Sequence, residues 1–207
     1  METLAQYIPV LVSQLSMWEA GAVSLAIAYL LLATRENIIC WYCAFVSTAI
    51  YTALFWQVSL LMESALNIYY MGMAVYGWHQ WRSGGQGHRG AVIRTLCRRR
   101  HLQVLMLIAT LTVISGYALS NTTQAAWPYV DSFTTWASVI TTIMVAKKIL
   151  ENWLYWLVID SVSIPLYIER GLHLTAFLFA AYLVIVVSGY LAWRKHYIED
   201  ANTRREI

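Results

Sequence analysis

Asp160 is the residue whose type and position most directly indicate a chemical role in this sequence. It lies within an apolar, aromatic-rich segment, residues 151–163. A carboxylate in the middle of a membrane-spanning helix costs about 2.5–3.5 kcal/mol, so such a group usually faces a bundle or a wet cavity and serves a function. Trp156, Asp160 and Ser163 are spaced i, i+4 and i+7, which places them on one helix face. An anion beside an aromatic ring and a hydroxyl suits a flat cationic ligand.

The composition indicates what kind of structure must position this segment. Hydrophobic residues make up 59% of the 207 residues, charged residues only 12%, and the mean hydropathy is +0.54. Soluble domains contain about 25% charged residues, so that class is excluded. The apolar runs are near 20 residues long and apolar on all sides, which predicts spanning helices rather than the short alternating strands of a barrel. The predicted fold class is therefore an all-α membrane protein.

Seven segments are long enough to cross a hydrocarbon core of about 30 Å at about 1.5 Å per residue. These segments are residues 17–34, 37–57, 59–81, 102–120, 128–147, 151–168 and 172–193. With seven spans, 13 of the 14 Lys and Arg residues fall on one side, in the loop 82–101, the tail 194–207 and two short turns. The positive-inside rule makes that side cytoplasmic and places the N-terminus outside.

The remaining motifs argue against other classes of protein. The basic run 98–101 directly precedes a span, so topology explains it; anionic lipid, not nucleic acid, is the expected contact. Cys40 and Cys43 lie inside an apolar segment without a second pair, so no metal site is expected. The sequence has no phosphate-binding glycine loop and no nucleophile or paired-carboxylate arrangement. We therefore expect no catalytic residue, no cofactor and no enzyme activity.

The two halves of the chain resemble each other. Glu36-Asn37 opens the second span and Glu151-Asn152 opens the sixth, an offset of 115 that pairs Trp41 with Trp156. This similarity predicts two copies of one three-helix unit. Because three is odd, one linker helix must return the chain to the starting side, which gives two parallel repeats in a 3+1+3 layout, as in SWEET-type transporters. The first repeat, linker helix and second repeat are residues 17–81, 102–120 and 128–193.

The predicted repeat places the binding site near the middle of the bilayer, between the two copies. The candidate substrate-binding residues are Trp41, Asn67, Tyr70, Trp156, Asp160 and Ser163. Each has a structural alternative: the tryptophans could pack in the core, Asn67 could bond a neighbouring helix, and Asp160 could form an ion pair, although no Lys or Arg lies in the interior of a span. Other tryptophans lie at span ends, where an aromatic belt would explain them without a ligand: Trp78, Trp81 and Trp193.

Two motifs resemble a known family. They are Tyr76-Gly77-Trp78-His79-Gln80-Trp81, at the end of the third span, and Lys148-Ile149-Leu150-Glu151-Asn152-Trp153-Leu154-Tyr155-Trp156, entering the sixth. With the 3+1+3 layout, they resemble the Pnu family of bacterial vitamin transporters from about residue 20 to 195. The resemblance implies a multi-pass inner-membrane protein that takes up nicotinamide riboside, thiamine or riboflavin by facilitated diffusion. It also implies a cytoplasmic kinase that phosphorylates and so traps the vitamin, and it allows a homotrimer.

Three positions bear on the choice of vitamin. The nicotinamide riboside branch of the family carries a glutamine and two asparagines where this chain has Asn67, Ala74 and Asp160. Two amides suited to a carboxamide are thus shortened or lost, and a carboxylate replaces the third. The expected substrate is therefore thiamine, a cation that Asp160 could contact, and nicotinamide riboside is the alternative. A membrane-embedded enzyme or sensor that uses Asp160 is the alternative class.

Overall fold

The computed structural model describes residues 17–57, 61–84, 90–122, 127–169 and 173–203. These residues form seven helices, and the predicted all-α class is confirmed for them. The helices are α2 (Met17–Thr34), α3 (Cys40–Gln57), α4 (Leu61–Ser83), α5 (Arg98–Thr122), α6 (Pro128–Ala146), α7 (Asn152–Glu169) and α8 (His173–Thr203). Among the described residues, three helical segments are, by length and composition alone, apolar enough to cross a membrane: Met17–Thr34, Arg98–Thr122 and Ala176–Thr203.

The described helices correspond one to one to the predicted spans, with two informative differences. Helix α5 begins at Arg98 instead of residue 102, so the basic run forms its first turn rather than the end of a loop. Helix α8 continues to Thr203 instead of ending at 193, so most of the predicted tail is helical. Hydropathy marks the end of an apolar segment, not the end of a helix. A helix can continue into polar residues, because Arg, Lys, Glu and Ala have high helix propensity.

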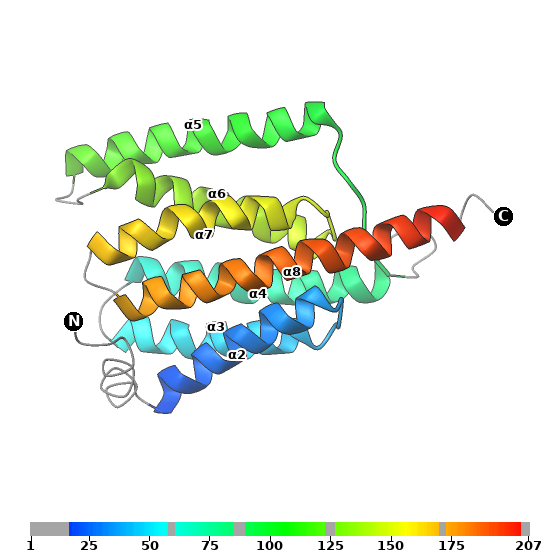
Figure 1. Ribbon diagram of the computed structural model, residues 1–207. Coiled ribbons are helices and arrows are strands. Elements are labelled where there is room, and N and C mark those ends of the chain that lie inside the picture. Colours follow the sequence, from blue (N-terminus) through cyan, green and yellow to red (C-terminus); the bar gives the residue numbers. More distant parts are fainter. Residues whose placement is uncertain (1–16, 58–60, 85–89, 123–126, 170–172, 204–207) are drawn as a thin grey trace, which may run out of the picture. The chain divides into compact units, whose positions relative to one another are not determined.

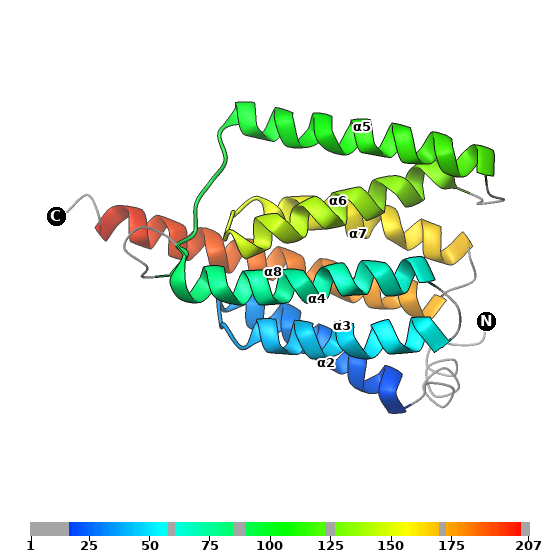
Figure 2. The same cartoon turned by 180° about the vertical axis from the view of Figure 1, so that it is seen from behind.

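The chain divides into two compact units, Met1–Trp78 and His79–Ile207, with the boundary inside α4. In the first unit, α2 packs against α3. In the second unit, α5 packs on α6, α6 on α7 and α7 on α8 (Figure 1). Figure 2 shows from behind how α5 runs beside α6. All the contacts described below lie within a single unit.

Hydroxyl groups join the helices of the first unit. The Ser47 hydroxyl on α3 donates to the carbonyl of Ala22 on α2 at 2.8 Å. The Ser64 hydroxyl on α4 donates to the carbonyl of Thr52 on α3 at 3.0 Å. Small residues and hydroxyls of this kind let membrane helices approach closely, because lipid offers no hydrophobic drive for their association.

Gly77 allows α4 to approach α3. A Cβ at Gly77 would collide with the indole of Trp41, whereas a Cβ at Gly72, on the same helix, would meet nothing within 4 Å. We therefore expect Gly77→Ala to lower the free energy of unfolding by about 1–3 kcal/mol through overpacking. Gly72→Ala is the matched control and should be neutral or stabilising by up to about 1 kcal/mol, since alanine favours a helix. Thermal unfolding in detergent measures both; equal stability of the two variants would contradict the packing argument.

Backbone geometry recurs between the α2–α3 and α6–α7 turns at a spacing of 112 residues rather than 115. Glu36 and Lys148 are the two non-glycine residues with positive φ in the described chain, at 52° and 49°. The matching N–H to carbonyl bonds are Glu36 to Ala33 and Lys148 to Val145, Asn37 to Leu32 and Ile149 to Met144, and Cys40 to Asn37 and Asn152 to Ile149. Glu36 thus lies at the left-handed turn residue, whereas Glu151 comes three residues after it, so the Glu-Asn similarity misaligns the halves by almost one helical turn.

The same spacing of 112 relates two tryptophan–glycine contacts. Trp41 packs on Gly77 in the first unit, and a Cβ at Gly189 would lie 2.7 Å from the ring of Trp153 in the second. Trp153, rather than Trp156, is therefore the structural counterpart of Trp41. Trp41 lies between α3 and α4, and Trp153 lies between α7 and α8.

Candidate functional site

Asp160 lies on α7 and is buried in protein. Only 3% of the residue is exposed, and no hydrogen bond or ion pair of its carboxylate occurs among the described residues. The predicted spans contain no Lys or Arg apart from Lys147, the last residue of the span 128–147. A buried carboxylate without a partner is costly in a membrane protein, which is why such residues are usually functional.

The two neighbours of Asp160 on the same helix face differ in their availability. Trp156 is half-buried and packs against a small core cluster formed by Ile108 of α5, Ala137 of α6 and Ile159 of α7. Ser163 is buried, and its hydroxyl donates to the carbonyl of Ile159 at 2.8 Å. Its donor is therefore used within the helix, while the lone pairs of its oxygen can still accept.

The first unit contains the other three predicted site residues. Trp41 is only 2% exposed; its ring packs on Gly77 and lies 5.9 Å from the ring of Tyr29. Asn67 and Tyr70 are half-buried and one turn apart on α4. Trp41 thus has a clear packing role, and its contact with a substrate stays a prediction, as does a site shared by residues of both units.

Thr141 on α6 has a property that the sequence did not reveal. It is fully buried, and its hydroxyl has no hydrogen-bond partner within the described part of the chain. The adjacent Thr142 shows the usual arrangement, donating to the carbonyl of Ser138 at 2.8 Å. Since helical threonines normally satisfy their hydroxyls in this way, the exception marks an available polar group in the second unit. No sequence signal distinguishes the two threonines.

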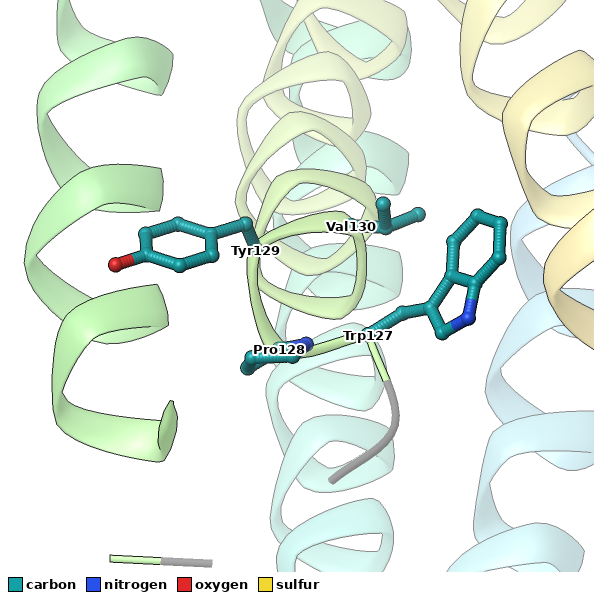
Figure 3. Close-up of a pocket in the computed structure, with 4 residues that line it drawn as sticks. All are labelled: Trp127, Pro128, Tyr129 and Val130. Atoms are coloured by element: carbon teal, nitrogen blue, oxygen red, sulfur yellow. The ribbon is translucent and has the colours of Figure 1, made fainter. Parts of the chain in front are cut away.

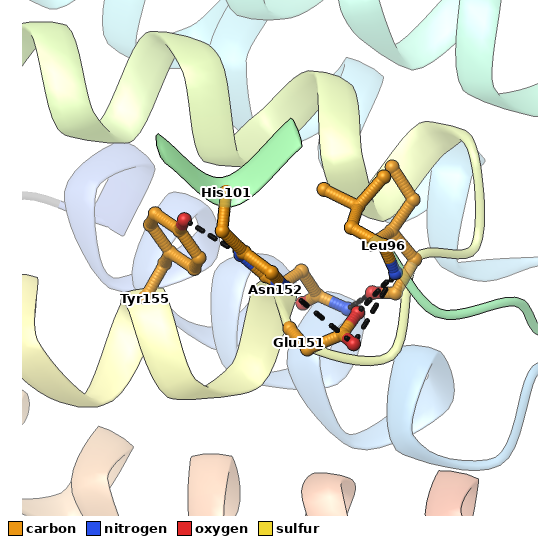
Figure 4. Close-up of polar contacts among 6 residues, drawn as sticks. Leu96, His101, Glu151, Asn152 and Tyr155 are labelled. Carbon is orange, nitrogen blue, oxygen red and sulfur yellow. Dashed lines mark hydrogen bonds and ion pairs between the residues drawn. The ribbon is translucent and has the colours of Figure 1, made fainter. Parts of the chain in front are cut away.

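Glu151 connects α7 to the segment that precedes α5 (Figure 4). Its carboxylate accepts from the Leu96 N–H at 3.2 and 3.3 Å and lies 3.6 Å from Nε2 of His101. Nδ1 of His101 lies 3.0 Å from the hydroxyl of Tyr155, and the two rings stack. Arg94 adds two backbone bonds, from its N–H to Lys148 and to its carbonyl from Leu150. The Glu-Asn-Trp motif therefore begins with a positioning residue.

Removing the charge of Glu151 should loosen this segment. We expect Glu151→Gln to raise the hydrogen-exchange rate of the Leu96 amide about five- to thirtyfold, because a hydrogen bond to a charged group contributes about 1.5–3 kcal/mol, part of which the amide retains. Exchange measured by mass spectrometry on a peptide covering residues 92–97 would detect it. Glu199→Gln is the control, because Glu199 is exposed and its carboxylate makes only a long ion pair, of 3.9 Å, with Lys195. Unchanged exchange in both variants would contradict the role of Glu151.

Three tryptophans form a cluster at one end of the second unit. The rings of Trp81 and Trp193 lie 6.0 Å apart, and those of Trp153 and Trp193 lie 5.4 Å apart, edge to face. Nε1 of Trp81 donates to the carbonyl of Val145 at 3.3 Å. Trp81 is 7% exposed and Trp193 is 0% exposed. The aromatic-belt interpretation is therefore wrong for these two residues, because protein rather than the membrane surface surrounds them.

Two surface hollows are lined by none of the predicted site residues. One, of about 240 Å³, is formed by the start of α6, where Trp127 and Tyr129 point to opposite sides and Tyr129 lies against Gly116 of α5 (Figure 3). The other, of about 380 Å³, is lined by Val92, Ile93, Arg94, Thr95, Tyr197 and Ala201. Within the described ranges, no group of three or more His, Cys, Asp or Glu residues could hold a metal ion.

Comparison with known proteins identifies the family. Residues 16–195 match the family described as Nicotinamide mononucleotide transporter. The chain belongs to this family. It is thus a membrane vitamin transporter of the Pnu type, as the two motifs predicted. A transporter family is consistent with the expectation that the protein is not an enzyme.

Several relatives are similar over most of the chain. The nicotinamide riboside transporter PnuC of Escherichia coli is 22% identical over 187 residues, which cover 78% of each chain. The riboflavin/roseoflavin transporter RibM of Streptomyces davaonensis is 24% identical over 178 residues, covering 84% of this chain and 80% of that protein. The crystal structure of the vitamin B3 transporter PnuC has the same fold, with a TM-score of 0.71 and 21% identity over 92% of this chain and 86% of the other.

Proposed function

We propose that this protein takes up nicotinamide riboside. The observation that carries the proposal is Asp160, a buried carboxylate without a partner among the described residues, one turn from the half-buried Trp156. The nicotinamide ring of this vitamin is flat and positively charged. An aromatic face and a carboxylate together stabilise such a cation by cation–π and charge–charge attraction.

The alternatives within the family fit less well. The expectation of thiamine is not supported, since the similar proteins are named for nicotinamide riboside and riboflavin. Riboflavin has an uncharged ring system, which would leave the carboxylate of Asp160 without compensation. The nicotinamide riboside branch has an amide where this chain has Asp160. In this proposal the carboxylate strengthens the contact with the charged nicotinamide ring, and the transported vitamin is the same.

The substrate site proposed here combines residues of both halves: Trp41, Asn67, Tyr70, Trp156, Asp160 and Ser163. Two parallel three-helix repeats, joined by α5 as the linker, form the proposed 3+1+3 architecture of the SWEET type. The recurrence of the left-handed turn at Glu36 and Lys148 supports this arrangement. In such transporters the two repeats move around a central site near the middle of the bilayer.

The proposed setting is the bacterial inner membrane, with the N-terminus outside and the C-terminus in the cytoplasm. Support comes from the distribution of charge, since 13 of the 14 Lys and Arg residues would lie on the cytoplasmic side. Transport is proposed to be facilitated diffusion, with phosphorylation by a cytoplasmic kinase trapping the vitamin. A homotrimer is the proposed assembly.

Uptake into proteoliposomes that contain only this protein tests the proposed function. Labelled nicotinamide riboside should enter without a proton or sodium gradient, whereas labelled riboflavin and thiamine should enter more slowly. Strict dependence on an ion gradient would refute facilitated diffusion. Faster entry of thiamine or riboflavin would refute the choice of vitamin, and the absence of any flux would favour the enzyme or sensor class.

A further inference from the structure

The turn between α6 and α7 directs a lysine onto the tryptophan cluster. Lys148 is only 9% exposed, and its Nζ lies 4.7 Å from the centre of the Trp81 ring. This distance is within the range of a cation–π interaction. Lys148 has φ of 49°, a left-handed conformation that costs a non-glycine residue about 1–2 kcal/mol. The turn therefore holds an ammonium group against an aromatic face at an energetic cost.

The equivalent turn of the first unit carries the opposite charge. Glu36 has the matching left-handed conformation, with φ of 52°. The two turns have the same backbone conformation, but only the turn between α6 and α7 has a lysine at the left-handed position. The turn geometry alone therefore does not require a lysine. Lys147, the preceding residue, is half-buried and has no described contact with the tryptophan cluster. The cation beside Trp81 is therefore a specific feature of residue 148.

Among the described residues, Trp153 of the cluster and the preceding residue, Asn152, each contain one unpaired polar atom. Nε1 of Trp153 and Oδ1 of Asn152 are buried and have no hydrogen-bond partner in the described ranges. The residues are 1% and 0% exposed. The amide of Asn152 is held by its own Nδ2, which donates to the carbonyl of Ile149 at 2.6 Å. Buried polar groups are normally paired, so one unused donor and one unused acceptor beside three aromatic rings indicate a binding function.

We infer that the cluster of Trp81, Trp153 and Trp193 is a second subsite for a flat organic cation, and that the ammonium of Lys148 occupies it in this structure. The subsite lies at the cytoplasmic end in the orientation proposed above, and its assignment rests on the proposed function. A substrate cation that leaves toward the cytoplasm displaces the ammonium from Trp81. Lys148 thus competes with the cation and lowers its affinity at the cytoplasmic exit, which favours release.

Replacing Lys148 by an uncharged side chain tests the competition. Efflux is measured from proteoliposomes loaded with increasing concentrations of nicotinamide riboside, with all protein oriented so that its cytoplasmic side faces the lumen. Lys148→Met should lower the half-saturation concentration about three- to tenfold, the range expected for loss of one competing cation–π contact. The dihydro form of nicotinamide riboside has a neutral ring and nearly the same shape. Its half-saturation concentration should not change.

Lys147→Met is the matched control, because it removes one positive charge from the same turn without removing the cation on Trp81. It should leave both half-saturation concentrations unchanged. An equal decrease in the two variants would show a general charge effect and would overturn the assignment. The same decrease for the neutral ligand would also overturn it. Lys148→Asn is a second variant, because asparagine tolerates the left-handed conformation.

A measurement on the unmodified protein does not depend on the folding of any variant. Binding of nicotinamide riboside should raise the rate at which Lys148 reacts with an amine-specific reagent at least threefold, relative to Lys147 in the same digest. An unchanged ratio would overturn the subsite. If the unmodified protein neither binds nor transports nicotinamide riboside, the proposed function fails as well; if it transports the vitamin but Lys148 does not respond, only the subsite fails.

Discussion

Asp160→Asn is expected to weaken binding of nicotinamide riboside about tenfold to a hundredfold. The substitution preserves the shape of the side chain but removes the negative charge, and a charge-assisted contact contributes about 1.5–3 kcal/mol. Stability should not decrease, because Asp160 is buried and its carboxylate has no partner in the described chain that the substitution would remove. A neutral amide is cheaper to bury than a carboxylate.

Titration calorimetry on the detergent-solubilised protein measures this affinity directly. Asp200→Asn, the same chemical change at an exposed residue near the end of α8, is the control and should bind like the unmodified protein. Unchanged affinity of Asp160→Asn would remove Asp160 from the binding site. A loss of affinity that is equally large for the neutral dihydro form would indicate a structural role instead of contact with a cation.

Trp153→Ala is expected to lower the free energy of unfolding by about 3–5 kcal/mol, the cost of truncating a large buried aromatic side chain. The Trp153 ring lies directly on Gly189 and meets the ring of Trp193 edge to face, so its removal leaves a cavity between α7 and α8.

Trp156→Ala separates the packing role of Trp153 from binding at the proposed site around Asp160. Trp156 is half-buried and lies next to the core cluster, so its truncation should cost less stability than that of Trp153. As a proposed site residue, it should instead lose affinity for nicotinamide riboside. Thermal unfolding and calorimetry on the two variants give the comparison. Equal loss of stability with equal loss of affinity would show that the two tryptophans do not have separate roles.

Local composition was sufficient to predict the helices. Each apolar run of about 20 residues can satisfy its backbone hydrogen bonds in a membrane only as a helix. This constraint acts within each segment, so the predicted span at 17–34 agrees with α2 and that at 128–147 with α6, which ends at Ala146. The burial of Asp160 was predicted for the same reason. The end of α8 was missed because its final turns are polar, and hydropathy does not report on polar helices.

The register of the internal similarity could not be read from identities alone. Glu36-Asn37 and Glu151-Asn152 look equivalent as letters, yet the left-handed residues are Glu36 and Lys148. A backbone conformation of this kind is set by the hydrogen bonds of the whole turn, in which residues of different types can serve. Trp153 consequently replaces Trp156 as the counterpart of Trp41.

The sequence by itself determined the class of protein, the number of described helices and the position of one buried charge, because each depends on residues close together in the chain. Only the tertiary structure decided which tryptophans are enclosed by protein, that Glu151 holds the segment before α5, and that Lys148 lies on Trp81. Those contacts join residues on different elements of the chain, such as Leu96 and Glu151, which are 55 positions apart. Hydropathy and spacing describe a single helix, whereas burial and partners depend on how several helices pack.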